Sequence, residues 1–285
     1  MSGRFAVLLA ALLWSTSGLF IKSPELLSVA PAERAGPLIA LWRGVFCAAL
    51  LLPFVRWRTL KFEWALISLF LSFSLMSICF ITAMTRSDAG DVIFLQYTAP
   101  FWVLLINWVW LREATPKRSL AALGVAMLGV LTIVGLGSGV GDWIGLCLAL
   151  VAGFGYGGVI VSLRLLRGQD SVSVMALTQL VCVVLLVPFL QGHDPWLSGG
   201  QWAWVGGLAV VQYAVPYVLF AWGLKQVGAQ EASILTLLEP VVNPIWVLLI
   251  WGQAIAPHTL IGGALILMAL LIRYTGGAAS STARA

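Results

Sequence analysis

The chain consists of long apolar runs separated by short polar segments. Each run is about 17 to 24 residues long, enough for a helix to cross a hydrocarbon layer roughly 30 Å thick. The runs do not alternate apolar and polar residues with a period of two, as the strands of a membrane barrel do. We therefore predict an all-α integral membrane protein with ten transmembrane helices, at residues 4–22, 36–55, 63–85, 91–111, 118–136, 141–163, 171–190, 200–223, 229–251 and 257–274.

Composition supports this prediction and excludes a soluble domain. The 285 residues are 61% hydrophobic and 9% charged, whereas soluble domains are roughly 45–50% apolar and about 25% charged. All four cysteines fall inside predicted spans, so we expect packing roles and no disulfides. Neither His193 nor His258 has a second ligand at metal-binding spacing. We predict no metal, no cofactor and no enzymatic activity, since nucleophile, zinc and ATP-binding motifs are absent from the sequence.

The basic residues predict the orientation in the membrane. Most of the 16 lysines and arginines fall in segments on the same side as the N-terminus; Lys22, Arg34 and Arg86 fall on the other side, and Arg43 lies within a span. The positive-inside rule then places both termini in the cytoplasm of a multi-pass protein in the inner (plasma) membrane. Because topology accounts for the net charge of +5, no nucleic-acid partner is required.

Two segments of the chain look like copies of each other. Residues 89–100, AGDVIFLQYTAP, and 229–240, AQEASILTLLEP, share a small residue, an acid, a leucine and a proline 140 positions apart. Five spans per half force the second half to enter the membrane from the opposite side, so the repeats are inverted. We predict a first repeat at 1–137, a second at 138–274 and a disordered tail at 275–285, with a binding site near the midplane between the repeats.

Three stretches resemble a known family. LLWSTSG in the first span, AGDVIFLQYTAPFWVLL in the fourth and EASILTLLEPVVNPIWVLL in the ninth are similar to the drug/metabolite transporter superfamily, in its EamA branch. The resemblance covers about residues 4–274. It implies ten helices in two inverted five-helix repeats around a central cavity lined by spans one, three, four, six, eight and nine, and it implies export of amino acids or other metabolites. One departure is that Glu113 follows span four, whereas Gln253 follows span nine.

Span nine carries a polar stripe that predicts a cavity or a helix partner. Ser233, Thr236, Glu239, Asn243 and Trp246 recur at helical spacing. A carboxylate in mid-membrane is costly, so Glu239 is a functional candidate that could bind a substrate ammonium or carry a proton during coupling. The alternative is a structural role between helices.

Three prolines predict kinked helices. Pro100, Pro216 and Pro240 lack a backbone donor and would free the carbonyl four residues earlier. Those carbonyls belong to polar residues, so each kink would offer paired acceptors near a cavity or serve packing alone. They belong to Gln96, Gln212 and Thr236.

Aromatic residues in the cavity-lining spans could form an apolar, cation-accepting wall, or could simply be core. Arg43 could bind a substrate carboxylate, but we favour a structural role in which it snorkels or pairs with Glu33. The predicted substrate-binding set is Trp14, Gln96, Tyr97, Phe101, Tyr156, Gln212, Tyr213, Tyr217, Thr236, Glu239 and Asn243, with Pro100, Pro216 and Pro240 as hinges.

These features together predict a secondary-active or facilitative transporter. By alternating access it would export small metabolites, most plausibly amino acids with apolar or aromatic side chains, as a monomer or homodimer with proton coupling as one hypothesis. Two alternatives remain open. A phosphorylated-sugar or nucleotide-sugar antiporter would need deep Lys or Arg clusters, and a broad lipophilic drug efflux protein would need no defined substrate.

Overall fold

We describe the protein from a computed structural model, over residues 2–30, 32–109, 117–137, 143–166, 168–190, 195–223, 226, 227, 232 and 235–275. In these ranges the regular elements are all helices, which confirms the predicted all-α class. The α-helices of the first half are α1 (Gly3–Trp14), α2 (Ser17–Ile21), α3 (Pro24–Leu27), α4 (Ala32–Leu51), α5 (Trp64–Arg86), α6 (Ala89–Gln96), α7 (Ala99–Val109) and α8 (Lys117–Gly137). Those of the second half are α9 (Trp143–Leu165), α10 (Ser171–Leu186), α11 (Gly199–Gly207), α12 (Val215–Gly223), α14 (Leu238–Trp251) and α15 (Pro257–Thr275).

Short helices of other types extend or join these elements. Three are 3₁₀ helices: η1 (Leu52–Phe54), η2 (Trp57–Thr59) and η3 (Val187–Leu190). The fourth, η4 (Leu208–Ala214), is a π-helix between α11 and α12. The three segments α11, η4 and α12 together form one long rod, so the eighth predicted span is continuous but changes its winding at its centre.

Eight helical segments in the described ranges are long and apolar enough to cross a membrane. They are Gly3–Ile21, Arg34–Phe54, Trp64–Arg86, Ala89–Ile106, Leu120–Gly137, Trp143–Leu165, Ser171–Phe189 and Gly199–Phe220. Two shorter apolar helices follow, Leu238–Trp251 and Pro257–Ile272. The ten segments follow the order of the ten predicted spans, while ten complete membrane crossings remain a prediction.

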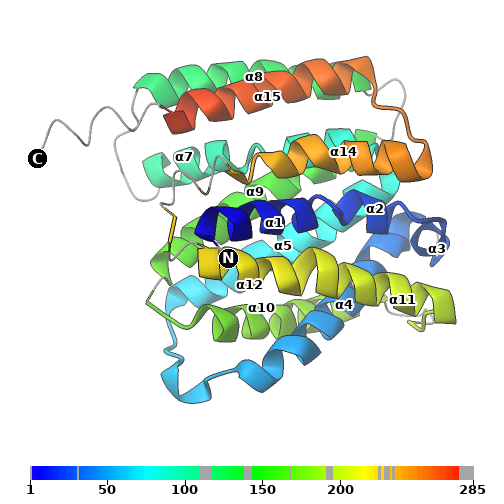
Figure 1. Ribbon diagram of the computed structural model, residues 1–285, viewed down its shortest axis with the longest axis vertical. Helices are drawn as coiled ribbons and strands as arrows, with labels where there is room; N and C mark the ends of the chain where they lie inside the picture. Colours follow the sequence, from blue (N-terminus) through cyan, green and yellow to red (C-terminus); the bar gives the residue numbers. More distant parts are fainter. Residues whose placement is uncertain are drawn as a thin grey trace, which may run out of the picture.

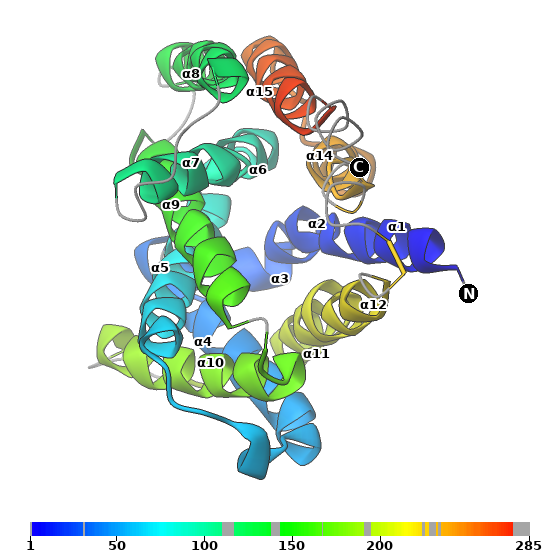
Figure 2. The same ribbon diagram turned by 90° about the vertical axis from the view of Figure 1, so that its left-hand side faces the viewer.

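The helices lie side by side in a bundle whose outer surface is apolar. In Figures 1 and 2, α8 and α15 form a pair at one edge and α4 and α10 lie at the opposite edge. Between them, α5 packs against α9 and α1 packs against α12. Outward-facing side chains of α8 such as Leu128 and Leu131 are 58% and 61% exposed, as expected for a surface in contact with lipid tails.

Polar contacts hold the connecting segments together at each end of the bundle. At one end the Gln169 amide donates to the carbonyl of Lys61 at 2.8 Å. At the other end the Lys22 ammonium donates to the carbonyl of Ser87 at 2.6 Å, and Gln253 donates to Asp88. Helix α1 begins, and α15 ends, at the same end of the bundle in Figure 1. These connecting segments therefore lie at two opposite ends of the bundle, and the predicted membrane topology remains a prediction.

One close helix crossing depends on glycine. Gly129 in α8 faces Gly262 in α15, and a Cβ on Gly129 would lie 2.6 Å from the carbonyl oxygen of Gly262. The reverse substitution would place a Cβ 2.7 Å from the carbonyl oxygen of Gly129. The pair thus allows the two backbones to approach closely, as small residues do in membrane helix pairs.

Helix α10 begins with a side-chain cap that should make its stability depend on pH. The backbone N–H and the hydroxyl of Ser173 both donate to Asp170 Oδ2, at 3.0 and 2.7 Å. The Ser173 hydroxyl, foremost, holds the pKa of Asp170 below its ordinary value. A lowered carboxyl pKa gives stability that is complete above the unfolded-chain pKa of about 3.9 and is lost as pH falls through the lower folded value.

We expect Asp170→Ala to reduce the free energy of unfolding at pH 7 by about 0.5–2 kcal/mol, the usual cost of a lost N-cap. Asp170→Asn retains a capping oxygen and should be as stable as the native chain at pH 7. Its stability should not show the Asp170-dependent fall that the native chain shows below about pH 4. Midpoints of thermal unfolding in detergent between pH 3 and 7 measure both effects. An unchanged midpoint in Asp170→Ala would contradict the capping role.

Candidate substrate-binding site

Interrupted helices surround the centre of the bundle. The first span breaks at Ser15–Thr16 between α1 and α2, and the fourth breaks at Tyr97–Thr98 between α6 and α7. The hydroxyls of Thr16 and Thr98 donate back to the carbonyls of Leu13 and Leu95, both at 2.6 Å. Such breaks are tolerated at membrane depth because protein groups satisfy the freed backbone atoms.

Each of the three prolines stands in the first turn of a helical segment that follows a break or a change of winding. Pro100 is the second residue of α7 and Pro240 the third residue of α14, where a missing N–H removes no intrahelical bond. Pro216 is the second residue of α12, directly after the π-helix η4, in which the N–H of Val215 donates to the carbonyl of Val210. Pro100 and Pro240 therefore stand at helix starts, while Pro216 stands where the winding of a continuous rod changes, and a hinge role for all three remains a prediction.

The breaks of spans four and nine meet at one carboxyl group. The Tyr97 hydroxyl lies 2.7 Å from Glu239 Oε2 and 3.0 Å from the carbonyl oxygen of Thr236. One hydroxyl proton cannot fully serve two acceptors, so these bonds compete while Glu239 is ionised. When Glu239 is protonated it can donate to the Tyr97 oxygen, and Tyr97 then donates to Thr236. The arrangement offers a hydrogen-bonded place for one proton.

The remainder of the polar stripe ties α14 to the first span. The Asn243 amide donates to Ser17 Oγ at 2.7 Å, and the Trp246 indole donates to Ser15 Oγ at 3.0 Å. Asn243 is fully buried, so in this conformation its side chain serves helix packing. Ser233, the first member of the stripe, lies outside the described residues.

Aromatic rings gather beside this region. The ring centroids of Trp14 and Tyr217 are 5.2 Å apart, and those of Tyr213 and Tyr217 are 4.7 Å apart. Phe73 approaches Tyr213 edge-on at 6.0 Å. Spans one, three and eight thus supply one continuous set of ring contacts, the aromatic wall, and substrate binding by Trp14, Tyr213 and Tyr217 remains a prediction.

Four other predicted site residues belong to four different helical segments. Phe101 in α7 is buried, and Tyr156 in α9 is half-buried against the same hydrophobic core. Gln96 ends α6 and is 8% exposed, while Gln212 in η4 has a buried Oε1 without a hydrogen-bond donor. A role of these four residues in substrate binding remains a prediction.

The structure reveals a polar network that the sequence did not suggest. Asp91 is 3% exposed and accepts a hydrogen bond of 2.5 Å from Thr259, and His258 Nε2 lies 3.4 Å from its other oxygen. A search for histidine ligands at local spacing misses the pair, because the two residues are 167 positions apart. Among the described residues, no group of three potential metal ligands forms.

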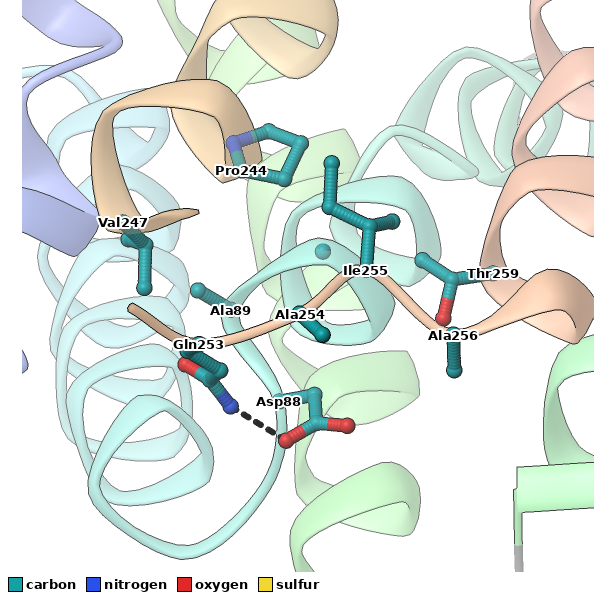
Figure 3. A pocket seen from close by; sticks show the side chains of 10 residues that line it. Asp88, Ala89, Pro244, Val247, Gln253, Ala254, Ile255, Ala256 and Thr259 are labelled. Atoms are coloured by element: carbon teal, nitrogen blue, oxygen red, sulfur yellow. Dashed lines mark hydrogen bonds between the residues drawn. The ribbon is translucent and has the colours of Figure 1, made fainter. Parts of the chain in front are cut away.

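A small hollow lies next to this network. It is lined by residues of the α14–α15 connection and the start of α6, with the Gln253–Asp88 hydrogen bond at its floor (Figure 3). Its volume is only about 10 Å³, room for about one water molecule. The hollow is therefore too small for a metabolite. Glu113, the sequence counterpart of Gln253 in the first repeat, lies outside the described residues.

These features define a class of protein. A bundle of apolar spans with interrupted helices and polar groups at its centre is typical of membrane transporters. The chain matches the EamA-like transporter family over residues 1–135 and 143–275, and it belongs to that family. The family resemblance predicted from the sequence is thus confirmed.

Relatives in other organisms are also named as transporters. The chain is 28% identical over 273 residues to an uncharacterized transporter of Archaeoglobus fulgidus, covering 95% of this chain and 96% of that protein. It is 28% identical over 294 residues to the uncharacterized transporter YwfM of Bacillus subtilis, covering 98% and 96%. A solved crystal structure shares the fold, with a TM-score of 0.66, 15% identity and coverage of 99% of both chains.

Proposed function

We propose that this transporter exports amino acids with apolar or aromatic side chains across the plasma membrane by alternating access. The observation that carries the proposal is the Glu239–Tyr97 pair at two facing helix breaks, close to the aromatic wall of Trp14, Tyr213 and Tyr217. A carboxylate suits an ammonium group, and aromatic rings suit an apolar side chain and also attract cations.

The helix packing supports two inverted repeats, 1–137 and 138–274. A pseudo-twofold exchange of the halves turns the contact of α5 with α9 into that of α12 with α1, and both contacts are present. The same exchange maps the pairs α4–α10 and α8–α15 onto themselves, and both pairs are also present. Equivalent contacts would let the halves exchange conformations, which is the basis of alternating access.

We further propose that both termini face the cytoplasm, because the order of the predicted spans puts most basic residues in connections on the side of the N-terminus. Proton coupling is part of this proposal, since the Tyr97–Glu239–Thr236 arrangement can be fully bonded only with an added proton. The protein would work in this way as a monomer or a homodimer; the predicted tail lies, from residue 276 onward, outside the described residues.

Counterflow in proteoliposomes tests the proposal. Vesicles preloaded with unlabelled L-phenylalanine should accumulate labelled L-phenylalanine, and Tyr213→Ala should reduce the initial rate by about tenfold, the scale of one lost aromatic contact. Trp108→Ala is the matched control, because this ring is 62% exposed on α7 and should leave the rate unchanged. Equal flux in empty liposomes for every apolar amino acid would contradict the proposed substrate class.

A further inference from the structure

Arg43 is a buried cation whose position differs from the sequence prediction. It lies in the middle of α4, is 4% exposed, and does not reach the edge of the bundle. Its Nη2 donates to Ser77 Oγ in α5 at 2.7 Å, and its guanidinium lies over the Tyr213 ring, 4.8 Å from the centroid. The side chain therefore points inward, toward the aromatic wall.

In the described part of the chain, no acidic side chain neutralises the charge of Arg43; the side chain of Glu33 lies outside that part. Within the described part of the chain no carboxylate pairs with the guanidinium, and its buried Nε has no acceptor. A buried guanidinium without an anion is costly, and its contact with the Tyr213 ring offsets that cost only in part. The site is thus electrostatically incomplete.

Further unpaired groups next to Arg43 are also donors. Ser74 Oγ and the Tyr213 hydroxyl are buried and make no hydrogen bond of ordinary length and angle, although the Cys182 thiol lies beside Ser74 and the Tyr217 hydroxyl lies beside Tyr213. Ser74 lies one helical turn before Ser77 on α5, and Tyr213 carries the ring under the guanidinium. An anion can accept from the guanidinium N–H and from both hydroxyls, whereas a cation could bond only the hydroxyl oxygens and would leave the guanidinium N–H without an acceptor.

Two tyrosines, Tyr213 and Tyr217, connect Arg43 with Glu239. Tyr213 touches Arg43 and stacks on Tyr217, and Tyr217 lies within electrostatic range of both Arg43 and Glu239. A ligand that spans the tyrosines would meet a positive group at one end and a carboxyl group at the other. A single guanidinium matches one carboxylate, whereas phosphate sites usually combine several cations.

We propose that Arg43, together with Ser74 and Tyr213, is the receptor for the carboxylate of the transported molecule, while Glu239 receives its ammonium group. This inference rests on the proposed function and deepens it, because it restricts the substrates to molecules that carry both charges. It also replaces the structural role that the sequence favoured for Arg43.

Ligand truncation combined with mutation tests the carboxylate site. Binding of L-phenylalanine, L-phenylalaninamide and 3-phenylpropionate to the detergent-purified protein is measured by calorimetry. The native chain should bind phenylalanine about 10- to 100-fold more tightly than the amide, the scale of one hydrogen bond to a charged group. Arg43→Gln should abolish this preference, weaken 3-phenylpropionate equally, and leave the amide within about twofold of its native affinity.

Controls separate recognition from folding. Arg58→Gln makes the same chemical change on an exposed residue and should alter no affinity. If Arg43→Gln does not fold, Arg43→Lys keeps the charge without the planar fork and should still weaken only the ligands that carry a carboxylate. Ser74→Ala should act in the same direction with a smaller effect. Equal weakening of all three ligands by these variants would show a structural role and overturn the inference.

The two proposals fail in different ways. If 3-phenylpropionate binds through Arg43 while neither amine-bearing ligand binds, the amino-acid function is wrong and the carboxylate site stands. If phenylalanine flux is observed in proteoliposomes but Arg43→Lys and Ser74→Ala leave the carboxylate preference intact, the carboxylate site is wrong and the function stands. Binding of phenyl phosphate alone through Arg43 would contradict both.

Discussion

Glu239→Gln is expected to reduce L-phenylalanine transport by about 10- to 100-fold, since charge-assisted hydrogen bonds contribute roughly 1.5–3 kcal/mol. Glutamine has nearly the same shape and still accepts the Tyr97 hydroxyl proton, which the carboxyl group accepts at 2.7 Å. It cannot supply a negative charge to a substrate ammonium group, nor can it carry a transported proton. The initial rate of uptake into proteoliposomes, with and without an imposed pH gradient, measures both losses.

Two control variants are needed to interpret this result. Glu25→Gln makes the same change on an exposed residue of the short helix α3 and should leave transport unchanged. Tyr97→Phe removes the hydroxyl while keeping the ring and the carboxyl group. We expect this variant to lose most of the stimulation of transport by a pH gradient. It should lose less of the exchange of unlabelled for labelled substrate. Native rates in Glu239→Gln at every pH would mean that the carboxyl group only joins helices.

Gly129→Ala is expected to destabilise the protein by about 1–3 kcal/mol, the usual cost of overpacking. The new Cβ would lie 2.6 Å from the backbone oxygen of Gly262 and 2.8 Å from Ile266 Cγ1, so α8 and α15 must separate. A backbone atom cannot move aside as a side chain can. Denaturation in mixed micelles with increasing dodecyl sulfate measures the loss as a lower midpoint.

The same helix provides a matched control. Gly124 lies five residues earlier in α8 and has nothing within 4 Å of an added Cβ. Gly124→Ala should be neutral or stabilise by up to about 1 kcal/mol, because alanine has the higher helix propensity. The double variant Gly129→Ala/Gly262→Ala should cost less than the sum of its single variants, since one separation of the helices relieves both contacts. Equal midpoints for Gly124→Ala and Gly129→Ala would refute the close-packing argument.

The apolar runs predicted the membrane helices well because a hydrocarbon layer imposes a length and a composition on every span. Where a span is interrupted, the same rule predicted the span but not the break within it. The predicted first span, 4–22, is two helices in the structure, since Ser15 and Thr16 bond to carbonyls of the preceding turn. The spacing of apolar residues does not reveal a helix break whose carbonyl groups accept hydrogen bonds from nearby hydroxyl groups.

The prolines illustrate a second difference. From sequence, a proline deep in an apolar run predicts a kink, and Pro100 and Pro240 were interpreted in this way. In the structure each lies in the first turn of a new helix. Just before the start of α14, the Tyr97 hydroxyl bonds the carbonyl of Thr236 across 139 positions of the chain, a contact that the sequence does not reveal.

Glu239 and the tyrosines of span eight were identifiable by residue type alone, since carboxyl and aromatic groups in mid-membrane need partners. The residues that they contact could not be identified from the sequence. Arg43 was expected near the membrane edge, yet helix packing holds it against Ser77 and Tyr213, which are 34 and 170 positions away. The Asp91–His258 contact is equally invisible to local spacing.

The sequence by itself determined the class of this protein: apolar runs of membrane length, the distribution of basic residues and two similar segments indicated a multi-pass transporter. Only the tertiary structure decided which buried polar groups pair with each other and which remain unpaired. The physical reason is that burial in a membrane is set by the composition of each span, whereas hydrogen bonds and charge pairs depend on helices brought together from distant parts of the chain.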